Sequence, residues 1–438
     1  MTHTKRRHTL YIYTALLLFC LSCTAKIQGQ PFDPSTAVQA SRLSKESKFY
    51  LVNCEPGEII YERFGHSGIR LVDPNLMIDV VYHYGVFDYL QPHFVARFVS
   101  GVTDYSIGCW PWELFLYDYH DRHSSVIIQE LNLTDEEKNR LFHALEENNK
   151  PENRLYRYNF VYDNCATRPF NMVMKTLNKQ IVVAPNTDTI NGIEIIENIR
   201  NTEGQTPTHT HNGEIATFRN VIEEHLGSNT WWKFAIDIVL GKEADQQIGW
   251  QQLLAFPKHQ SEILSQINII DSSTSESKPL VKSTTEALSY PPVALPNNGI
   301  FNPIAICALW LIFVVTITLY EWRKRTYHIW LDIAQLLFFG FFGCIIFYLM
   351  FFSYHPLVES NYNLLWLNPL QILFAFIICK RSWRKKSIIY MWFNIVTVTI
   401  GIFFWAFGPQ VMHPAFLLLM IAMMIRSLYF TIYHTKQS

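Results

Sequence analysis

The stretch YDNCATRPF, residues Tyr162–Phe170, marks the point where a strand-like run gives way to a helix-like run. The upstream residues Arg154–Tyr162 are rich in aromatic and β-forming types and predict a strand. Pro169 is tolerated only in the first turn of a helix, so the helix that follows is expected to begin near Cys165 or Ala166. Backbone N–H groups and the helix dipole at such a terminus favour a thiolate and can bind an oxyanion. Cys165 is therefore a candidate nucleophile.

Two neighbours of Cys165 are candidate substrate contacts, and each has a second interpretation. Asn164 could contact a substrate, but a residue just before a helix more often caps it. Arg168 could bind a lipid phosphate, or it could form an ordinary surface salt bridge.

The first residues of the chain predict export from the cytoplasm. Lys5–Arg7 are basic, an apolar run follows over residues 10–21, and small and polar residues come next. This is the plan of a signal peptide, and the apolar run is shorter than the about 20 residues of a spanning helix. Residues 1–29 are therefore expected to be a signal peptide or a retained N-terminal anchor. Cys23 also admits a lipoprotein-type signal.

The remaining chain divides into two parts of different composition. Residues 31–270 contain the charges, turns and mixed periodicities of a soluble domain, whereas residues 301–438 are dominated by apolar and aromatic types. The overall hydrophobic content of 49% and the net charge of −1 average over these two parts. Residues 271–300 are rich in Ser, Thr and Pro and show no apolar period, so we expect them to form a linker.

Five apolar segments of the C-terminal part are candidate membrane helices. They are expected over residues 303–320, 329–353, 364–379, 388–407 and 414–432. Basic residues cluster in 323–325 and 380–386, while the alternate loops, 354–363 and 408–413, contain no Lys or Arg. The positive-inside rule makes the basic loops cytoplasmic, and an odd number of spans then places residues 31–298 in the periplasm. The signal segment independently predicts the same location.

Three cysteines fall in the exported domain, where disulfides are permitted. They are Cys54, Cys109 and Cys165, so at least one thiol stays unpaired. Cys165 could pair with one of the others. Alternatively, Cys54 and Cys109 pair or stay buried and free, and Cys165 is reactive. Counting does not decide between these alternatives.

A nucleophilic cysteine needs a base, and His66 is the strongest candidate. Residues 64–72 and 76–84 predict two strands joined by a turn at 73–75, with His66 near the start of the first strand and Asp79 on the second. We expect Asp79 to face His66 across this hairpin and to orient its imidazole. The rival bases are His83, His93, His120 and His123. A metal site at the last two would lack carboxylate or Cys partners at helical spacing.

Further residues are candidate substrate contacts, with packing as the alternative. Tyr82 and Tyr84 could line the site, although aromatic packing on a strand explains them equally well. The loop after the second membrane helix is expected on the periplasmic side, where His355, Asn361 and Asn363 could bind lipid headgroups. Plain anchoring at the membrane interface is the other interpretation of this loop.

The order of these residues resembles that of a known enzyme class. The chain has a His at the start of a hairpin strand, a polar residue about a dozen positions later, and Asn-Cys at a helix start. This order is similar to that of the circularly permuted papain-like enzymes, such as lecithin–retinol acyltransferase and relatives of the NlpC/P60 peptidases. At family level the chain resembles the lipoprotein N-acyltransferases of Bacteroidota. The resemblance rests on four stretches that precede the membrane spans: FGHSGIRLVDP, IDVVYHYGVFDY, YNFVYDNCATR and WWKFAIDIVLGKEAD. Pro169 and Cys109 depart from the family pattern without touching the expected chemistry.

The resemblance implies an α+β, permuted papain-like periplasmic domain followed by an all-α transmembrane bundle of about five helices in the bacterial inner membrane. It also implies acyl transfer: His66 deprotonates Cys165, which attacks an ester of a membrane phospholipid. The resulting acyl-thioester would then acylate the α-amine of a diacylglyceryl-cysteine lipoprotein. No cofactor, metal or nucleic acid is expected, since the sequence has no P-loop, GxGxxG motif or dense Cys/His cluster.

Two other function classes stay open. A membrane-anchored cysteine amidase or endopeptidase acting on peptidoglycan would use the same dyad, although it would need only one anchor. A non-catalytic receptor or assembly factor would keep Cys165 as a structural residue.

Overall fold

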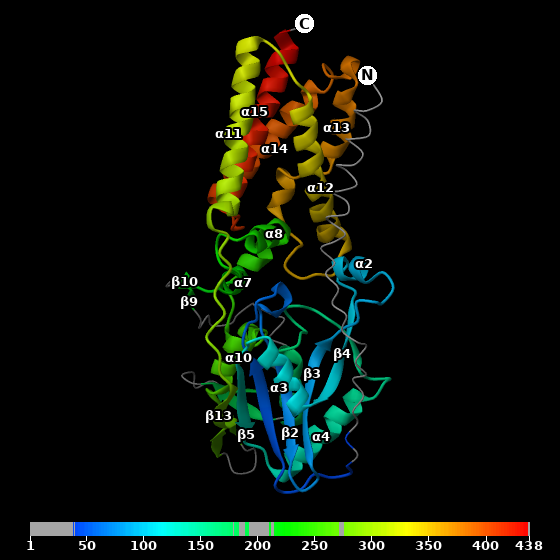
Figure 1. The fold of residues 1–438 in the computed structure, drawn as a ribbon, viewed down its shortest axis with the longest axis vertical. Helices are drawn as coiled ribbons and strands as arrows, with labels where there is room; N and C mark the ends of the chain where they lie inside the picture. The colour runs from blue at the N-terminus through cyan, green and yellow to red at the C-terminus, as the bar shows by residue number, and fades with distance from the viewer. Residues whose placement is uncertain are drawn as a thin grey trace. The chain divides into compact units, whose positions relative to one another are not determined.

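The computed structural model describes residues 38, 40–177, 179–183, 189–191, 210–211, 214–270 and 276–436 (Figure 1). The expected signal segment, residues 1–29, lies outside these ranges. The described chain consists of an N-terminal α/β domain and a C-terminal group of apolar helices.

A seven-stranded antiparallel sheet forms the centre of the N-terminal domain. Its strands follow the order β13-β5-β1-β2-β3-β4-β6. They are β13 (Val281–Leu288), β5 (Val126–Leu131), β1 (Lys48–Cys54), β2 (His66–Asp73), β3 (Ile78–Val86), β4 (Asp104–Pro111) and β6 (Leu155–Arg157). The expected hairpin over residues 64–84 is confirmed as β2 and β3.

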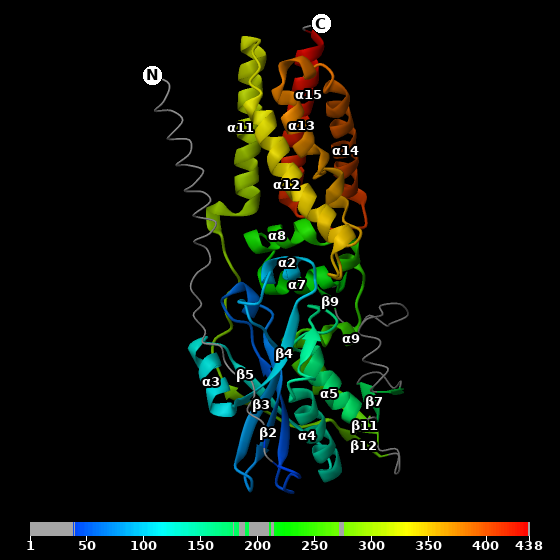
Figure 2. The same cartoon turned by 90° about the vertical axis from the view of Figure 1, so that its right-hand side faces the viewer.

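The two faces of this sheet are covered by different helices (Figure 2). Alternation along β1 sends Phe49 and Leu51 to one face and Val52 and Cys54 to the other, because successive side chains of a strand point in opposite directions. The first face packs against α4 (Asp135–Asn149) and α5 (Thr167–Leu177), and the second against α3 (Trp112–Asp121). The sheet is therefore a middle layer between two helical layers.

Smaller elements surround this core. A second, four-stranded sheet has the order β12-β11-β7-β8, and a two-stranded sheet joins β9 to β10. Their bounds are β7 (Gln180–Val183), β8 (Thr189–Asn191), β9 (Thr210–His211), β10 (Glu214–Ile215), β11 (Ile267–Ile270) and β12 (Ser277–Pro279). The remaining helices are α2 (Phe94–Val99), α7 (Phe218–Leu226), α8 (Trp231–Val239), α9 (Trp250–Leu253) and α10 (Pro257–Leu264).

The strand predicted at Arg154–Tyr162 is shorter in the structure. β6 ends at Arg157, because the side-chain oxygen of Asn159 accepts hydrogen bonds from the backbone N–H groups of Val161 (3.1 Å) and Tyr162 (2.9 Å). An Asn that bonds its own backbone in this way turns the chain out of the sheet. The helix predicted after this turn is present as α5.

The linker prediction for residues 271–300 is wrong for Ser277–Pro279 and Val281–Leu288. The first range is β12, which pairs with β11, and the second is β13, which adds to the edge of the central sheet beside β5. Most of its side chains are exposed, so neither face needs apolar residues and the alternation that signals a strand is missing. Residues 289–298 have neither helix nor strand and lead into the apolar helices.

Five helices in the described part of the chain are long and apolar enough to cross a membrane, as the sequence predicts. They are α11 (Pro303–Lys324), α12 (Trp330–Phe352), the segment Tyr362–Cys379, α14 (Ile388–Phe407) and α15 (Pro414–Lys436). The third segment is broken into a 3-10 turn, Tyr362–Leu365, and α13 (Leu370–Cys379), because Pro369 fits only at a helix start. At 1.5 Å per residue, α13 is about 15 Å long, half of a bilayer core.

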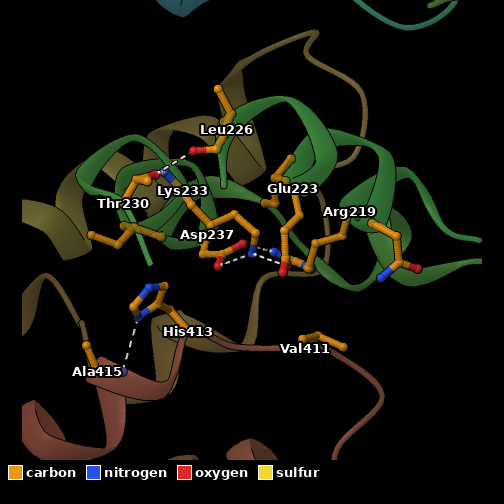
Figure 3. A network of polar contacts seen from close by, with 12 residues as sticks. Arg219, Glu223, Leu226, Thr230, Lys233, Asp237, Val411, His413 and Ala415 are labelled. Atoms are coloured by element: carbon orange, nitrogen blue, oxygen red, sulfur yellow. Dashed lines mark hydrogen bonds and ion pairs between the residues drawn. The ribbon is translucent and has the colours of Figure 1, made fainter. Parts of the chain in front are cut away.

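A buried ion-pair network joins α7 to α8 (Figure 3). Arg219 of α7 contacts Asp237 of α8 at 2.6 Å and Asp245 at 2.7 Å, and Lys233 contacts Asp237 at 2.5 Å. Arg219, Lys233 and Asp237 are at most 3% exposed. His413, from the loop before α15, lies beside this network, and burial lowers the pKa of its imidazole to about 4. The network therefore fixes the helix pair that adjoins the membrane helices.

Replacement of Arg219 by Met is expected to destabilise the protein strongly. The change leaves Asp245 as a buried carboxylate without its cation, and such losses cost about 3–5 kcal/mol. Arg157→Met is the matched control, because Arg157 pairs with Asp104 at 2.8 Å but is 54% exposed, and exposed pairs contribute less than about 1 kcal/mol. Thermal unfolding in detergent should show a much larger drop in the midpoint for Arg219→Met. Equal midpoints for the two variants would contradict a stabilising role for the network.

Candidate active site

Cys165 lies in the turn between β6 and α5, held by the residue before it. The side-chain oxygen of Asn164 accepts hydrogen bonds from the N–H groups of Ala166 (2.8 Å) and Thr167 (2.9 Å). Its amide nitrogen donates to the carbonyl of Ala255 at 2.9 Å, and the residue is 5% exposed. All of its polar atoms are engaged, so Asn164 is a helix cap and the expected substrate contact is not found.

The thiol of Cys165 lies beside the start of β2. It accepts hydrogen bonds from the backbone N–H groups of Ser67 and of Cys165 itself and from the hydroxyl of Tyr158. Gly85 of β3 adopts φ +91°, and a Cβ there would stand 3.3 Å from the Cβ of Cys165. A glycine is therefore required where β3 passes the cysteine. Because Ser67 follows His66 directly, the structure brings the expected nucleophile and the expected base into one region.

Burial dominates the protonation state of this thiol. Desolvation raises the pKa of Cys165 to about 11, although the hydrogen bonds from Tyr158 and from the two backbone N–H groups lower it in part. The backbone N–H groups act in the expected direction, but desolvation outweighs them. The side chain is half-buried and carries its proton at neutral pH.

His66 forms a pair with His83, the imidazole of the neighbouring strand. His66 Nε2 and His83 Nδ1 are 3.2 Å apart, with one ring donating to the other. Burial, followed by the positive charge of Arg122, lowers the pKa of His66 to about 3. Burial also lowers the pKa of His83 well below its ordinary value. Both imidazoles are therefore neutral at neutral pH, and burial makes His66 a weak base.

Aromatic rings hold the two imidazoles in place. His66 stacks on Tyr119 of α3 with ring centroids 6.4 Å apart. His83 meets Trp110 edge-on at 4.7 Å and Phe115 at 5.6 Å. The pair thus lies on the sheet face that α3 covers, and its orientation is fixed by packing.

Asp79 does not face His66, so the expected orienting role is not supported. In the β2–β3 register Asp79 is opposite Val72, six residues along β2 from His66. At about 3.3 Å per residue this places the two near opposite ends of the strand. The carboxylate of Asp79 instead binds Arg70 through two contacts of 2.7 Å. The same register places His83 opposite Gly68, so counting pairs outward from the turn would have found His83 as the neighbour of His66.

Tyr82 and Tyr84 point away from the site. Both flank His83 on β3, and alternation sends them to the opposite face, into the core beneath α4. There the hydroxyl of Tyr82 donates to Glu146 at 2.6 Å and that of Tyr84 to Asn148 at 2.8 Å. Packing, the alternative interpretation, accounts for both residues.

Arg168 is engaged by its own turn. Its guanidinium binds both carboxylate oxygens of Asp163 at 2.5 and 2.7 Å. The same group lies over the ring of Tyr156 at 3.9 Å. The salt-bridge interpretation matches the structure, and the phosphate contact stays a prediction.

Three side chains of the loop after α12 were predicted to bind lipid headgroups. In the structure they bind backbone carbonyls of the N-terminal domain. Asn361 donates to the carbonyl of Ile238 at 2.8 Å, and Asn363 donates to that of Asp237 at 2.9 Å. Both amides are at most 2% exposed and bind carbonyls near the C-terminal end of α8. His355 donates from Nε2 to the carbonyl of Phe98 at 2.6 Å. These three side chains therefore have structural partners in place of lipid.

The two other cysteines of the domain are unpaired, and two of the rival histidines contact a tyrosine ring. Cys54 and Cys109 are free and buried, and they lie on opposite faces of the sheet, where they cannot pair. His120 and His123 meet the ring of Tyr290 at 6.0 and 5.4 Å. Among the residues that the structure describes, no group of three His, Cys, Asp or Glu side chains could hold a metal.

Comparison with protein families gives two matches. A family described as the Lnb N-terminal periplasmic domain matches residues 38–197, and a family described as the Lnb transmembrane domain matches residues 296–438. No curated protein and no solved structure matches the chain. The first match contains His66, His83 and Cys165, and the second contains all five apolar segments. The two domains in this order are the architecture of the Bacteroidota-type lipoprotein N-acyltransferases, and the chain belongs to this family of multi-pass membrane enzymes with a periplasmic domain.

Proposed function

We propose that Cys165 carries an acyl group from a membrane phospholipid to the α-amine of a diacylglyceryl-cysteine lipoprotein. The observation that carries this proposal is the hydrogen bond from the backbone N–H of Ser67, the residue after His66, to the Cys165 thiol just before α5, together with the His66–His83 contact. Family membership and the five apolar segments support a reaction between membrane lipids.

The first half-reaction forms an acyl-thioester. The sulfur of Cys165 attacks the ester carbonyl while His66 takes the thiol proton, and the carbonyl oxygen becomes an oxyanion. The backbone N–H groups of Ser67 and Cys165, which bond the thiol, are the proposed donors to that oxyanion. Collapse breaks the ester C–O bond, and His66 returns its proton to the departing lysophospholipid oxygen.

The second half-reaction transfers the acyl group. The neutral α-amine of the lipoprotein attacks the thioester carbonyl, and His66 removes a proton from the nitrogen. The C–S bond breaks, the sulfur regains that proton, and an amide is left on the lipoprotein. A thioester is a good donor to an amine, which fits the choice of cysteine over serine.

His83 takes the positioning role that the sequence suggested for Asp79. Its Nδ1 holds Nε2 of His66 at 3.2 Å, which leaves the other nitrogen of His66 to exchange protons with the sulfur. A neutral imidazole beside a neutral thiol favours proton transfer during the attack over a preformed ion pair.

Cys165→Ala and Cys165→Ser should both abolish N-acylation, because no acyl-enzyme can form on carbon and an alcohol is harder to deprotonate than a thiol. Mass spectrometry of lipoprotein N-terminal peptides, in cells without another N-acyltransferase, measures this. In the wild-type chain an acyl group on Cys165 should accumulate when the acceptor is withheld and should be released by hydroxylamine.

Cys109→Ser is the matched control, because Cys109 is fully buried in the core beneath α4, on the sheet face opposite the His66–His83 pair. It should keep the acylation chemistry while lowering stability. Full activity of Cys165→Ala would rule out the thioester mechanism. Cleavage of peptidoglycan fragments in place of lipoprotein acylation would favour the amidase alternative.

Substitution of the proposed base, His66, should lower kcat more than substitution of His83, which only positions it. His66→Ala should lose at least about 100-fold in kcat, since a positioned base contributes about 10²–10⁴-fold. His83→Gln should lose less, because its amide still holds the His66 ring. Asp79→Asn should remain close to the wild type, because Asp79 binds Arg70. A larger loss in Asp79→Asn than in His83→Gln would return the orienting role to Asp79.

The raised pKa of Cys165 predicts a characteristic pH dependence of alkylation. Only the thiolate reacts with a neutral reagent such as iodoacetamide, and a pKa of about 11 makes the thiolate scarce at neutral pH. The rate of Cys165 modification, followed by peptide mass spectrometry, should therefore rise about tenfold per pH unit from pH ~7 to ~10. A plateau reached below pH ~8 would instead indicate a preformed thiolate–imidazolium pair.

A further inference from the structure

The segment between β3 and β4, residues Phe87–Val102, exposes large apolar side chains. Leu90 is 87% exposed, Val95 74%, Tyr89 53% and Phe98 50%. Val95 and Phe98 are three residues apart on α2 and so share one helix face. An exposed apolar surface of this kind marks a protein or membrane contact.

The polar side chain of α2 is turned inward, the reverse of an ordinary surface helix. Arg97 binds Asp104 at 2.5 Å, the side chain of Gln91 at 3.0 Å and the carbonyl of Val102 at 3.3 Å. The Arg97 side chain stays 30% exposed, and the other five side chains of α2 are apolar. This arrangement suits a lipid environment better than water.

The segment lies against the periplasmic end of a membrane helix, as both views show (Figures 1 and 2). The hydroxyls of Ser100 and Tyr348 on α12 are 2.7 Å apart, and the N–H of Tyr354 donates to the carbonyl of Ser100 at 2.9 Å. The last turn of α12 exposes Phe351 and Phe352, which are 60% and 61% accessible. The apolar face of α2 is therefore continuous with the lipid-facing surface of α12.

A row of aromatic rings connects this face to Cys165. Tyr158, whose hydroxyl binds the thiol, stacks on Tyr105 at 4.3 Å, and Tyr105 meets Phe87 at 5.0 Å. Phe87 meets Phe94 at 5.8 Å, and Phe94 stacks on Phe98 at 6.2 Å. The row thus runs without interruption from the sulfur to the exposed end of α2.

We propose that Phe87–Val102 inserts its apolar face among the acyl chains of the outer leaflet and that the aromatic row guides the donor acyl chain to Cys165. This deepens, and rests on, the proposed acyl transfer, because it names the acyl chain of a bilayer lipid as the group that occupies this face. Entry along α2 keeps the chain in apolar contact while its ester leaves the bilayer.

The position of the segment is tested with the full-length protein in vesicles of phosphatidylethanolamine and phosphatidylglycerol that carry brominated acyl chains. An environment-sensitive fluorescent amino acid replaces Leu90 or Val95. The control replaces Met77, which is 93% exposed in the β2–β3 turn. Bromine should quench the first two probes and leave the third unchanged. Equal quenching at all three positions, or a blue-shifted but unquenched emission that indicates a protein contact such as a second copy or the acceptor, would overturn the proposal.

The functional consequence is tested with Leu90→Asp/Val95→Asp against Met77→Asp. The rate of acyl-thioester formation on Cys165 is measured with vesicle phospholipid and with a short-chain, water-soluble p-nitrophenyl ester. The double variant should lose at least about tenfold more with the phospholipid than with the soluble ester, since a carboxylate resists burial among acyl chains. Equal losses with both esters would overturn the proposal. Absence of a thioester from either ester in the wild-type chain would instead reject the acyl transfer, and the quenching result would still decide the placement of α2.

Discussion

The register of the β2–β3 hairpin determines which side chains meet at Cys165. It places His66 and His83 on one sheet face and lets Gly85 pass the cysteine without a Cβ between them. Because the side-chain period of a strand is two, a slip by one residue would turn His83 into the core and bring a tyrosine to the site. The tyrosine hydroxyls bonded to Glu146 and Asn148, together with the Arg70–Asp79 pair, hold the register far from the chemistry.

At the membrane side of the domain, polar side chains form buried contacts within the protein, and apolar side chains form much of the exposed surface. The buried amides of Asn361 and Asn363 and the ion pairs around Arg219 serve to hold α8 against the loops of the bundle. The side chains that α2 exposes there, which include Val95 and Phe98, are apolar. This division follows from cost, since a buried amide or charge must be satisfied inside the protein, whereas an apolar side chain is indifferent to whether its neighbour is protein or lipid.

Sequence patterns predict the parts of this protein whose signals are local. The hairpin, the helix start after Cys165 and the five apolar segments each have a period, a proline or a hydropathy run. β13 escaped prediction because an edge strand with two exposed faces has no apolar alternation. For the site, the sequence led to the segment around His66 and to Cys165, and the Ser67 N–H bonds the Cys165 thiol. A count of residue pairs along the hairpin would have placed Asp79 opposite Val72 and away from His66. Asn164 and Arg168 bind groups in their own turn or elsewhere in the fold. Residue type alone does not show whether such a side chain binds the protein or a substrate.

The protonation state of the thiols affects how readily they are oxidised in an oxidising compartment. Cys54 and Cys165 lie near enough for charge on Cys165 to raise the pKa of Cys54. Burial raises the pKa of both, and disulfide exchange and oxidation by peroxide both proceed through the thiolate. If Cys165 is the nucleophile of the proposed acyl transfer, the desolvation that keeps its thiol protonated therefore also slows its oxidation.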